Sequence, residues 1–348
     1  MTTTEQVLRH LEEHRGVPQS GETIAEEFSI SRTAVWKAVK SLREAGYEII
    51  ARPKKGYYLP MDSDILSREA VEAYLRAGEA DWESAPGSKP QIHVKKEATS
   101  TNRELSEMAL QGAPTRTVLV TGAQTNGRGH RNHRFSSPEG GLYMSILLRD
   151  TDLPFEGSAQ ITAAGALAVK RAVQRVTGQS LGIRWVNDLY LNGKKVCGIL
   201  TEGASDLESG QLKWIVLGIG INYRTSPTDY PEEIRDRITS LYPAKSGEKE
   251  DIGHRPEEDG VPPRAKLVAE ILKELLYHPQ TQEERMKQYR DSLDQKGKEV
   301  IVTPIRNGEE QRAERFTATV EDVDDEMQLV ITTEGRRQSL KFGEASIE

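Results

Sequence analysis

The sequence has a single cysteine, Cys197, among its 348 residues, which excludes an internal disulfide and a cysteine-rich zinc site. It has no apolar run close to the roughly 20 residues that a membrane-spanning helix needs. Its first residues carry neither the basic nor the apolar stretch of a secretory signal. We therefore expect a cytoplasmic protein in a reducing compartment, with no contact with a membrane.

The composition is typical of a globular chain, because 36% of the residues are hydrophobic and 29% are charged. The length predicts two or three domains, and no internal repeat is found. We expect a multidomain α+β protein with parts at 1–63, 64–294 and 295–348. Helical patterns and a hairpin occupy the first part, strands alternate with helices in the second, and short strands succeed one another in the third.

The clearest patterns outside the first part are helices at 158–177 and 263–277 and strands at 299–303, 316–320, 328–332 and 339–342. Two other segments, 77–90 and 244–262, have the composition of linkers. The second holds six acidic and three basic residues with scattered glycine and proline, so we expect a solvated, mobile insertion.

Positive charge is concentrated near the N-terminus. Residues 31–60 have a net charge of +5, whereas the whole chain has −7 and the remainder therefore −12. Such a local basic patch on an acidic protein indicates a specific docking surface. Ser20 and Ser31 are expected to cap two short helices, and a hairpin at 47–59 follows with a cationic tip.

Two helices joined by a tight turn, the second with a basic outer face, predict a winged helix-turn-helix that places this second helix in the major groove of DNA. The tip of the hairpin suits phosphate contacts. Trp36 faces either outward or into the core, and a winged helix that binds protein is the alternative. The residues expected to contact DNA are Arg32, Thr33, Trp36, Lys37, Lys40, Arg43, Lys54 and Lys55.

Three segments of the second part carry polar residues beside strands. Ser100-Thr101-Asn102 precedes a helix, and Thr101 with Glu104 predicts a capping box, although a plain helix cap is the simpler interpretation of this motif alone. The loop 124–135 follows a strand and combines two glycines with five residues that can carry positive charge. Taken alone, it is a solvated basic loop; together with the motifs described next, it predicts an anion site.

The third segment, 184–199, predicts two strands joined by a type I′ turn at Asn192-Gly193, with Arg184 and Lys195 on facing strands. A buried strand at 214–222 contains glycines that leave room for a ligand beside the sheet.

Read together, these motifs are recognisable. Gln-Thr-Asn-Gly-Arg-Gly-His at 124–130, Arg-Trp-Val-Asn-Asp-Leu-Tyr-Leu at 184–191, Lys-Lys-Val-Cys-Gly-Ile-Leu-Thr-Glu at 194–202 and Gly-Ile-Gly-Ile-Asn at 218–222 resemble those of biotin–protein ligases, in order and spacing. With the winged helix, the chain resembles the bifunctional biotin ligases and biotin operon repressors of bacteria. The resemblance implies a catalytic domain similar to class II tRNA synthetases and an SH3-like C-terminal barrel.

The resemblance implies two steps: biotin and Mg-ATP give biotinyl-5′-adenylate, and a lysine of a biotin carboxyl carrier protein, or of another biotin-dependent carboxylase, then displaces AMP. The implied catalytic residues are Lys195, Arg128, Arg184 and Asp188, of which Asp188 either holds Mg²⁺ or orients the incoming lysine. The implied biotin site consists of Ser100, Thr101, Asn102, Gln124, Arg128, Gly129, His130, Lys195 and Gly198. The implied nucleotide site consists of Arg128, Arg131, Phe135, Arg184 and Asn222.

The sequence departs from the family at three positions within or beside these motifs. His130 stands where arginine is usual, Phe135 where tryptophan is, and Val186 where proline is common. Because histidine is mostly neutral at pH 7, we expect a weaker or pH-dependent hold on the adenylate. Equal rates of adenylate release from the wild type and His130→Arg at pH 6 and pH 8 would contradict this.

Regulation is implied as well: bound adenylate would favour a homodimer through sheet edges and so place two winged helices on operator DNA. Two alternative functions are also compatible with the sequence. One is an enzyme similar to lipoate–protein ligases; the other is a ligand-sensing repressor without catalytic activity. An ion pair between Arg184 and Asp188 is the structural alternative to their catalytic roles, and Cys197 is expected to be an inert strand residue.

Overall fold

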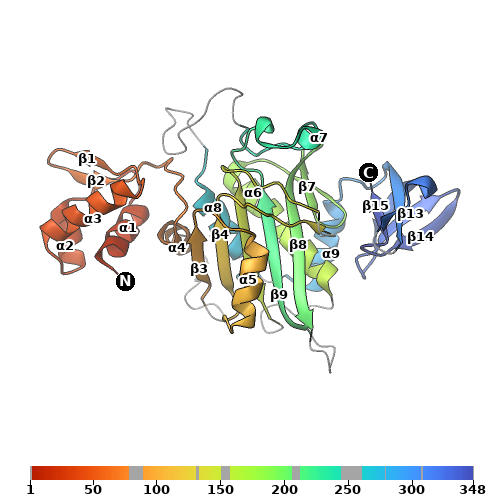
Figure 1. The fold of residues 1–348 in the computed structure, drawn as a ribbon, viewed down its shortest axis with the longest axis horizontal. Helices are drawn as coiled ribbons and strands as arrows, with labels where there is room; N and C mark the ends of the chain where they lie inside the picture. Colours follow the sequence, from red (N-terminus) through yellow and green to blue (C-terminus); the bar gives the residue numbers. More distant parts are fainter. Residues whose placement is uncertain are drawn as a thin grey trace. The chain divides into compact units, whose positions relative to one another are not determined.

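The computed structural model describes residues 2–77, 89–130, 133–149, 157–205, 212–243, 261–278, 280–306 and 309–347. The chain divides into two compact units. Figure 1 labels their helices and strands. One comprises 1–89, 175–177 and 247–273, and the other comprises 90–174, 178–246 and 274–348. No helix among the described residues is long and apolar enough to cross a membrane. The predicted part boundaries at 63 and 294 stay predictions, and most of both linker-like segments lies outside the described residues.

The N-terminal part of the first unit is a winged helix. Its elements are α1 (Thr3–Glu13), α2 (Gly21–Glu27), α3 (Arg32–Glu44), β1 (Ile50–Arg52) and β2 (Gly56–Tyr58). The predicted caps are confirmed, since the hydroxyls of Ser20 and Ser31 accept hydrogen bonds from the backbone N–H groups of Thr23 and Ala34. Apolar residues of all three helices form the core, which β1–β2 and its neighbouring residues close.

The hairpin that forms the wing depends on Gly56. Its φ is +102°, and a Cβ there would lie 1.9 Å from the carbonyl oxygen of Gln19, which bonds to Tyr57. A larger residue would therefore push the wing away from the segment before α2. Trp36 is 53% exposed, so it points outward from α3 and not into the core.

The last helix of the winged-helix region is α4 (Arg68–Arg76), which packs on α1. Asp64 precedes α4 in the sequence. It forms a buried ion pair with Arg264, the first residue of α8 (Arg264–Leu276). The Asp64 carboxylate accepts the backbone N–H of Arg264 at 2.6 Å and its Nε at 2.9 Å. This pair links the chain just after the wing to a helix 200 residues later within the same unit.

The second unit is built on a seven-stranded sheet of order β3-β4-β5-β9-β8-β7-β6, in which only β3 and β4 are parallel. The strands are β3 (Gln91–Lys95), β4 (Thr117–Thr121), β5 (Leu142–Leu148), β6 (Gly182–Arg184), β7 (Asp188–Leu191), β8 (Lys194–Ser205) and β9 (Leu212–Ile221). Every residue of β4 and β5 is buried, which is why both appear in the sequence as continuous apolar runs.

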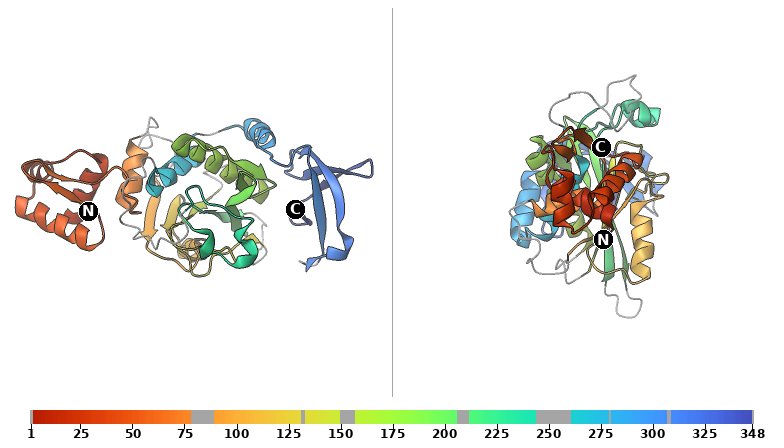
Figure 2. Two further views of the ribbon diagram at one scale, coloured as in Figure 1. Left: turned by 90° about the horizontal axis from the view of Figure 1, so that it is seen from above. Right: turned by 90° about the vertical axis from the view of Figure 1, so that its left-hand side faces the viewer.

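Helices α5 (Thr101–Leu110) and α6 (Ser158–Thr177) cover opposite faces of this sheet (Figure 2). The side chain of Asn102 on α5 lies against Gly218, whereas Gly165 of α6 lies against Leu217. Neighbouring strand residues point to opposite faces, so these contacts assign the two helices to different sides. A short 3₁₀ turn (Pro227–Asp229), α7 (Glu232–Arg235) and α9 (Gln282–Asp291) complete the helices described here.

The prediction of one unbroken strand from 184 to 191 is wrong. The segment folds into two short strands, in which Arg184 pairs with Asp188, and β7 lies between β6 and β8. The strand is interrupted because Trp185 makes hydrogen bonds to residues outside this sheet. Its backbone N–H donates to the side chain of Gln295, and its indole N–H donates to the carbonyl of Met327. Arg184 and Lys195 are therefore not on facing strands.

The second turn of this region is confirmed. Asn192 and Gly193 have φ values of +50° and +79° and join β7 to β8, as a type I′ hairpin requires.

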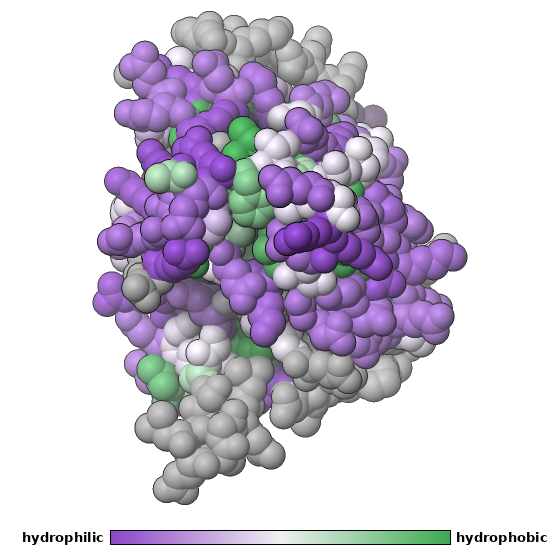
Figure 3. Space-filling model, turned by 90° about the vertical axis from the view of Figure 1, so that its right-hand side faces the viewer, coloured by the Kyte–Doolittle hydropathy of each residue, from purple (hydrophilic) through white to green (hydrophobic). Residues whose placement is uncertain are grey.

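The C-terminal residues form the predicted β domain, an antiparallel sheet of order β11-β10-β12-β13-β14 with β15 paired to β10. Its strands are β10 (Glu299–Arg306), β11 (Glu309–Glu310), β12 (Phe316–Val323), β13 (Leu329–Thr333), β14 (Arg336–Leu340) and β15 (Ala345–Ile347), with a 3₁₀ turn at Arg312–Glu314. Most of β14 is exposed and polar, and the face shown in Figure 3 is largely hydrophilic. The α+β fold is thus confirmed.

Candidate active site

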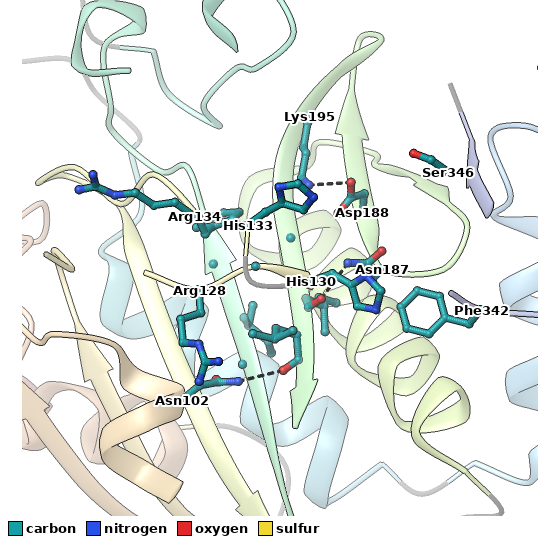
Figure 4. Close-up of a pocket in the computed structure, with 18 of the residues that line it drawn as sticks. Asn102, Arg128, His130, His133, Arg134, Asn187, Asp188, Lys195, Phe342 and Ser346 are labelled. Carbon is teal, nitrogen blue, oxygen red and sulfur yellow. Dashed lines mark hydrogen bonds and ion pairs between the residues drawn. The ribbon is translucent and has the colours of Figure 1, made fainter. Parts of the chain in front are cut away.

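A cavity of about 490 Å³ lies on the face of the central sheet that α5 covers. Most of the residues predicted for the site line it: Ser100, Thr101, Asn102, Gln124, Arg128, Gly129, His130, Phe135, Asp188, Lys195 and Gly198. Figure 4 shows several of these side chains converging from the loop after β4 and from β7 and β8. Arg184 and Asn222 are not among the lining residues, and Arg131 lies outside the described residues.

The N-terminus of α5 is arranged differently from the predicted capping box. Ser100, not Thr101, occupies the cap position, and its side chain makes no capping hydrogen bond. Instead the Glu104 carboxylate reaches back to accept the backbone N–H of Thr99 at 2.7 Å and pairs with Lys95 at 2.6 Å. Burial alone would raise the pKa of Glu104, but these partners outweigh it and lower the pKa below 4.5.

Thr101 is freed by this arrangement to join the cavity wall. Its backbone N–H and its hydroxyl both lie within hydrogen-bond distance of the Gln124 side-chain oxygen, at 2.8 Å and 3.2 Å. The amide nitrogen of Gln124 donates in turn to Ser137 at 2.9 Å. The helix start and the loop after β4, separate in the sequence, are therefore fixed to each other.

Asn102 is buried and held at both ends of its amide. Its Oδ1 accepts the hydroxyl of Ser145 at 2.6 Å, and its Nδ2 donates to the carbonyl of Leu200 and to Glu202. A Cβ on Gly218 would lie 2.0 Å from that Oδ1, so only glycine leaves room for it.

The glycine-rich loop folds back on itself. The backbone N–H of Gly129 donates to His133 at 2.7 Å, and that of Phe135 donates to Gly127 at 2.9 Å. A Cβ on Gly127 would lie 2.4 Å from the hydroxyl of Ser137, which explains the first glycine of the motif.

The ring of Phe135 packs against the sheet between two other glycines. Its edge carbons would lie 2.8 Å and 2.6 Å from a Cβ on Gly198 and Gly220. The backbone of Gly198, expected to face biotin, is therefore in contact with Phe135. The place of Phe135 in the nucleotide site stays a prediction.

His130 contacts the C-terminal domain. Its ring lies 4.5 Å from that of Phe342, which in turn meets Trp185 edge-on at 6.0 Å. Phe342 and residues of β11 and β15 also line the cavity, although nothing in the sequence pattern indicated this. His130, one of the residues that depart from the family, thus lies between the loop and the last sheet.

Lys195 and Asp188 form an ion pair on neighbouring strands, with 2.6 Å between Nζ and Oδ2 (Figure 4). Burial opposes the charge of the ammonium, but the adjacent carboxylate outweighs burial and raises the pKa of Lys195 above its usual 10.5. The other carboxylate oxygen, Oδ1, is buried and makes no hydrogen bond. Lys195 is therefore a fixed cation in the cavity at neutral pH.

Arg237 is a lining residue that the sequence did not indicate. Backbone hydrogen bonds hold its segment beside Lys195, since Lys195 N–H donates to Arg237 and Thr239 N–H donates to Lys195. A lone arginine after a short helix carries no sequence signal, and only this pairing places it at the cavity.

The two predicted residues that do not line the cavity have other partners. The Arg184 guanidinium lies over the ring of Tyr190 at 3.8 Å and 3.5 Å from an oxygen of Asp294, so the suggested ion pair with Asp188 does not form. Asn222 is buried and donates to Thr239 at 3.0 Å. Their roles toward the nucleotide stay predictions.

Cys197 is buried in β8, and burial raises the pKa of its thiol well above the usual value. This fits an unreactive strand residue. Among the described residues no cluster of three or more histidine, cysteine or acidic side chains is suited to hold a metal.

The DNA-facing residues predicted on α3 and the wing are all exposed. Arg43 has an additional structural contact: its Nε and Nη2 donate to the carbonyl of Ile49 at 2.8 Å and 2.5 Å. This guanidinium therefore fixes the end of α3 to the start of the wing.

Comparison with known proteins agrees with this architecture. Residues 94–222 match the biotin/lipoate A/B protein ligase family, and residues 3–58 match a helix-turn-helix (HTH) domain. The bifunctional ligase/repressor BirA of Bacillus subtilis is 37% identical over 233 residues, which cover 67% of this chain and 68% of that protein. The chain belongs to this family of bifunctional ligase/repressors.

Two further relatives extend the comparison. A biotin–[acetyl-CoA-carboxylase] ligase of Mycobacterium tuberculosis is 27% identical over 264 residues, 73% of this chain and 88% of that protein. The biotin protein ligase of Aquifex aeolicus, solved with biotin and ATP, aligns with 74% of this chain and 98% of its own at a TM-score of 0.56 and 28% identity. The family inferred from the four motifs is thereby confirmed.

Proposed function

We propose that this chain forms biotinyl-5′-adenylate from biotin and ATP, transfers the biotinyl group to a lysine of a biotin carboxyl carrier protein, and represses transcription in response to biotin. The cavity carries this proposal, because it brings the cations Lys195 and Arg128 together with the amide groups of Asn102 and Gln124. Its volume of about 490 Å³ lies within the range of small-molecule sites.

In the first step an oxygen of the biotin carboxylate attacks the α-phosphorus of ATP, and pyrophosphate leaves with the electrons of the broken P–O bond. No side chain of the protein needs to act as a nucleophile. The proposed task of Lys195 and Arg128 is to hold the two anionic groups together and to stabilise the charge that develops between them. The raised pKa of Lys195 supports this, since the ammonium stays charged at neutral pH.

In the second step the neutral amine of the acceptor lysine attacks the carbonyl carbon of the mixed anhydride, AMP leaves, and the amine loses a proton. Asp188 lies beside Lys195, and its free oxygen offers a place where that proton or the incoming amine could be held.

The same oxygen of Asp188 would also hold a Mg²⁺ ion, because Mg²⁺ in nucleotide sites is commonly bound by one or two carboxylates. Bound there, the ion would neutralise phosphate charge. Asp188 is therefore proposed to hold either the acceptor amine or a Mg²⁺ ion.

The winged helix supplies the second activity. The exposed basic residues of α3 and the wing support contact with operator DNA. A homodimer formed through a sheet edge, such as the exposed edge strand β3, would present two winged helices to a palindromic operator. Sedimentation with and without biotinyl-adenylate would reveal whether the ligand promotes that dimer.

The catalytic proposal is tested by incubating the chain with ATP, Mg²⁺, biotin and a biotin carboxyl carrier domain and measuring the mass of the carrier. We expect one added biotinyl group, and none when lipoate replaces biotin. Lys195→Ala should lower the rate about 100-fold or more. Lys194→Ala, which changes the exposed neighbour on the same strand, is the control and should have no effect.

Labelling with lipoate instead of biotin would favour the lipoate-ligase alternative. Absence of any labelling or of biotin-dependent ATP–pyrophosphate exchange, with biotin-dependent DNA binding retained, would favour a sensor without catalysis. Full labelling by Lys195→Ala would show that the role assigned to this lysine is wrong.

A further inference from the structure

We propose that Glu202 is a positioning residue that fixes Asn102 and Arg128 to one another, so that the parts of the cavity assigned to biotin and to the phosphate keep a single geometry. The inference rests on the proposed function and adds a residue to it. Glu202 ends the third motif described above, at 194–202, and none of the predicted roles included it.

The carboxylate of Glu202 has two partners, one for each oxygen. Oε2 accepts Nδ2 of Asn102 at 2.9 Å, and Oε1 lies 3.3 Å from a guanidinium nitrogen of Arg128. Asn102 and Arg128 line the cavity, whereas Glu202 itself does not. Figure 4 shows these two side chains close together at one side of the cavity. Glu202 therefore acts through them and not on the reacting atoms.

The hydrogen bond to Glu202 determines which way the amide of Asn102 points. Oδ1 accepts the hydroxyl of Ser145, and Nδ2 faces two acceptors, the carbonyl of Leu200 and the Glu202 carboxylate. A reversed amide would place its oxygen against both of these oxygens and leave buried groups unpaired. Because Asn102 is only 4% exposed, water cannot readily replace these partners.

The ion pair with Arg128 acts on orientation more than on stability. The two side chains are 40% and 30% exposed, and pairs with this exposure contribute about 0–1 kcal/mol to folding. The backbone on both sides of Arg128 is held, because Gly129 and Gly127 make backbone hydrogen bonds within the loop and Arg128 is bridged to Arg134. The freedom that remains lies in the long guanidinium side chain. An anchor at Glu202, on the sheet, restricts the directions in which the guanidinium can meet an anionic ligand.

These two contacts can be separated by substitution. Glu202→Gln keeps one carbonyl oxygen, which can still accept from Asn102, but removes the charge beside Arg128. Glu202→Ala removes both contacts. We expect Glu202→Gln to accelerate release of biotinyl-adenylate about 10-fold while KM for biotin stays within about twofold of the wild type. We expect Glu202→Ala to accelerate release and to raise KM for biotin about 10-fold.

The coupling between Glu202 and Arg128 is tested directly in the Arg128→Ala variant. If Glu202 acts through Arg128, then Glu202→Gln added to Arg128→Ala should change adenylate release no further. The matched control is Glu321→Gln, because Glu321 is also a strand glutamate paired with an arginine, Arg337, at 3.0 Å. That variant should match the wild type in KM, kcat and release.

The outcomes separate this inference from the proposed function. Failure of the wild type to form adenylate would overturn the function itself. Normal adenylate formation with unchanged release in Glu202→Gln, or equal additional effects of that change with and without Arg128, would overturn the role of Glu202 alone. If Glu202→Ala fails to fold, the milder Glu202→Gln still decides the question, provided that its melting temperature lies within about 2 °C of the wild type.

Discussion

At the scale of single residues, the site depends on charges whose partners are already in place. Lys195 sits where burial disfavours an ammonium ion, and the Asp188 carboxylate at 2.6 Å reverses that preference. Arg128 has an equivalent partner in Glu202. Both cations are thus paired with acids that belong to the same sheet, so the strands position the groups that hold them.

Replacement of Asp188 by asparagine should make adenylate formation sensitive to alkaline pH. The wild-type pKa of Lys195 is raised, so the charge is present throughout the neutral range and is lost only above 10.5. Without the carboxylate, burial is opposed only by the smaller electrostatic effects of Tyr190 and Cys197, so the pKa of Lys195 falls below its wild-type value. The alkaline limb of biotin-dependent ATP–pyrophosphate exchange should move down accordingly.

The control for this experiment is Asp325→Asn, which removes an aspartate paired with Arg290 at 2.7 Å outside the cavity. Its pH profile should coincide with that of the wild type. An Asp188→Asn profile with an unshifted alkaline limb would contradict the role assigned to this carboxylate.

At the scale of secondary-structure elements, the start of α5 is held by one carboxylate. Glu104 accepts backbone N–H groups ahead of the helix and pairs with Lys95, and its pKa is lowered. A depressed carboxylate stabilises the fold above its unfolded pKa near 4.5, and this contribution disappears as the pH falls through the folded value. The benefit is therefore fully present at pH 7.

Glu104→Gln should destabilise the second unit at pH 7 by about 0.5–2 kcal/mol, the usual effect of losing a helix cap. Thermal unfolding followed by circular dichroism should show a lower melting temperature at pH 7, and the difference from the wild type should shrink below pH 4.5. Glu107→Gln, which removes an exposed pair with Arg103 on the same helix, should cost less than about 0.5 kcal/mol. Equal effects of the two changes would argue against the special position of Glu104.

Local signals predicted the elements whose determinants are close in the sequence. The caps at Ser20 and Ser31 and the turn at Asn192-Gly193 belong to this class, because each depends on residues within a few positions. The break of the strand after Arg184 does not. It depends on Gln295 and Met327, more than 100 residues away, and no periodicity within the strand can report such partners.

The same distinction applies to the site. Residues within the four motifs were identified because they are contiguous, and most of them meet in the cavity. Arg237 and Phe342 were missed, since the pairing of separate segments brings them there. Arg184 was expected in the nucleotide site because its motif resembles that of the family, and it lies instead against Tyr190 and Asp294.

At the scale of the whole molecule, the first unit is held together by contacts between distant parts of the chain. Asp64 and Arg264 are 2% and 7% exposed, and hydrogen bonds from the backbone N–H, Nε and Nη2 of Arg264 join them. Nearby, Arg15 pairs with Glu12 and donates to the carbonyl of Ser63. The winged helix is therefore joined through buried charges to α8, not merely through its linker.

Asp64→Ala should destabilise this unit by about 3–5 kcal/mol, since it leaves a buried guanidinium without its carboxylate. Thermal unfolding should show an earlier transition for the first unit, with carrier biotinylation retained below it. The double variant Asp64→Leu with Arg264→Met should recover much of the loss, because a buried ion pair can often be replaced by apolar side chains. Equal melting of all three proteins would contradict a structural role for the pair.

The glycines at 198, 218 and 220 give the cavity an unusual kind of fragility. At each of them a single added carbon would meet Asn102 or Phe135 at less than 3 Å. Every substitution of glycine adds at least a Cβ atom, so no conservative substitution exists at these positions. An ordinary core position often tolerates a smaller side chain. At these three positions only glycine fits, so the shape of the cavity depends on the absence of side chains there.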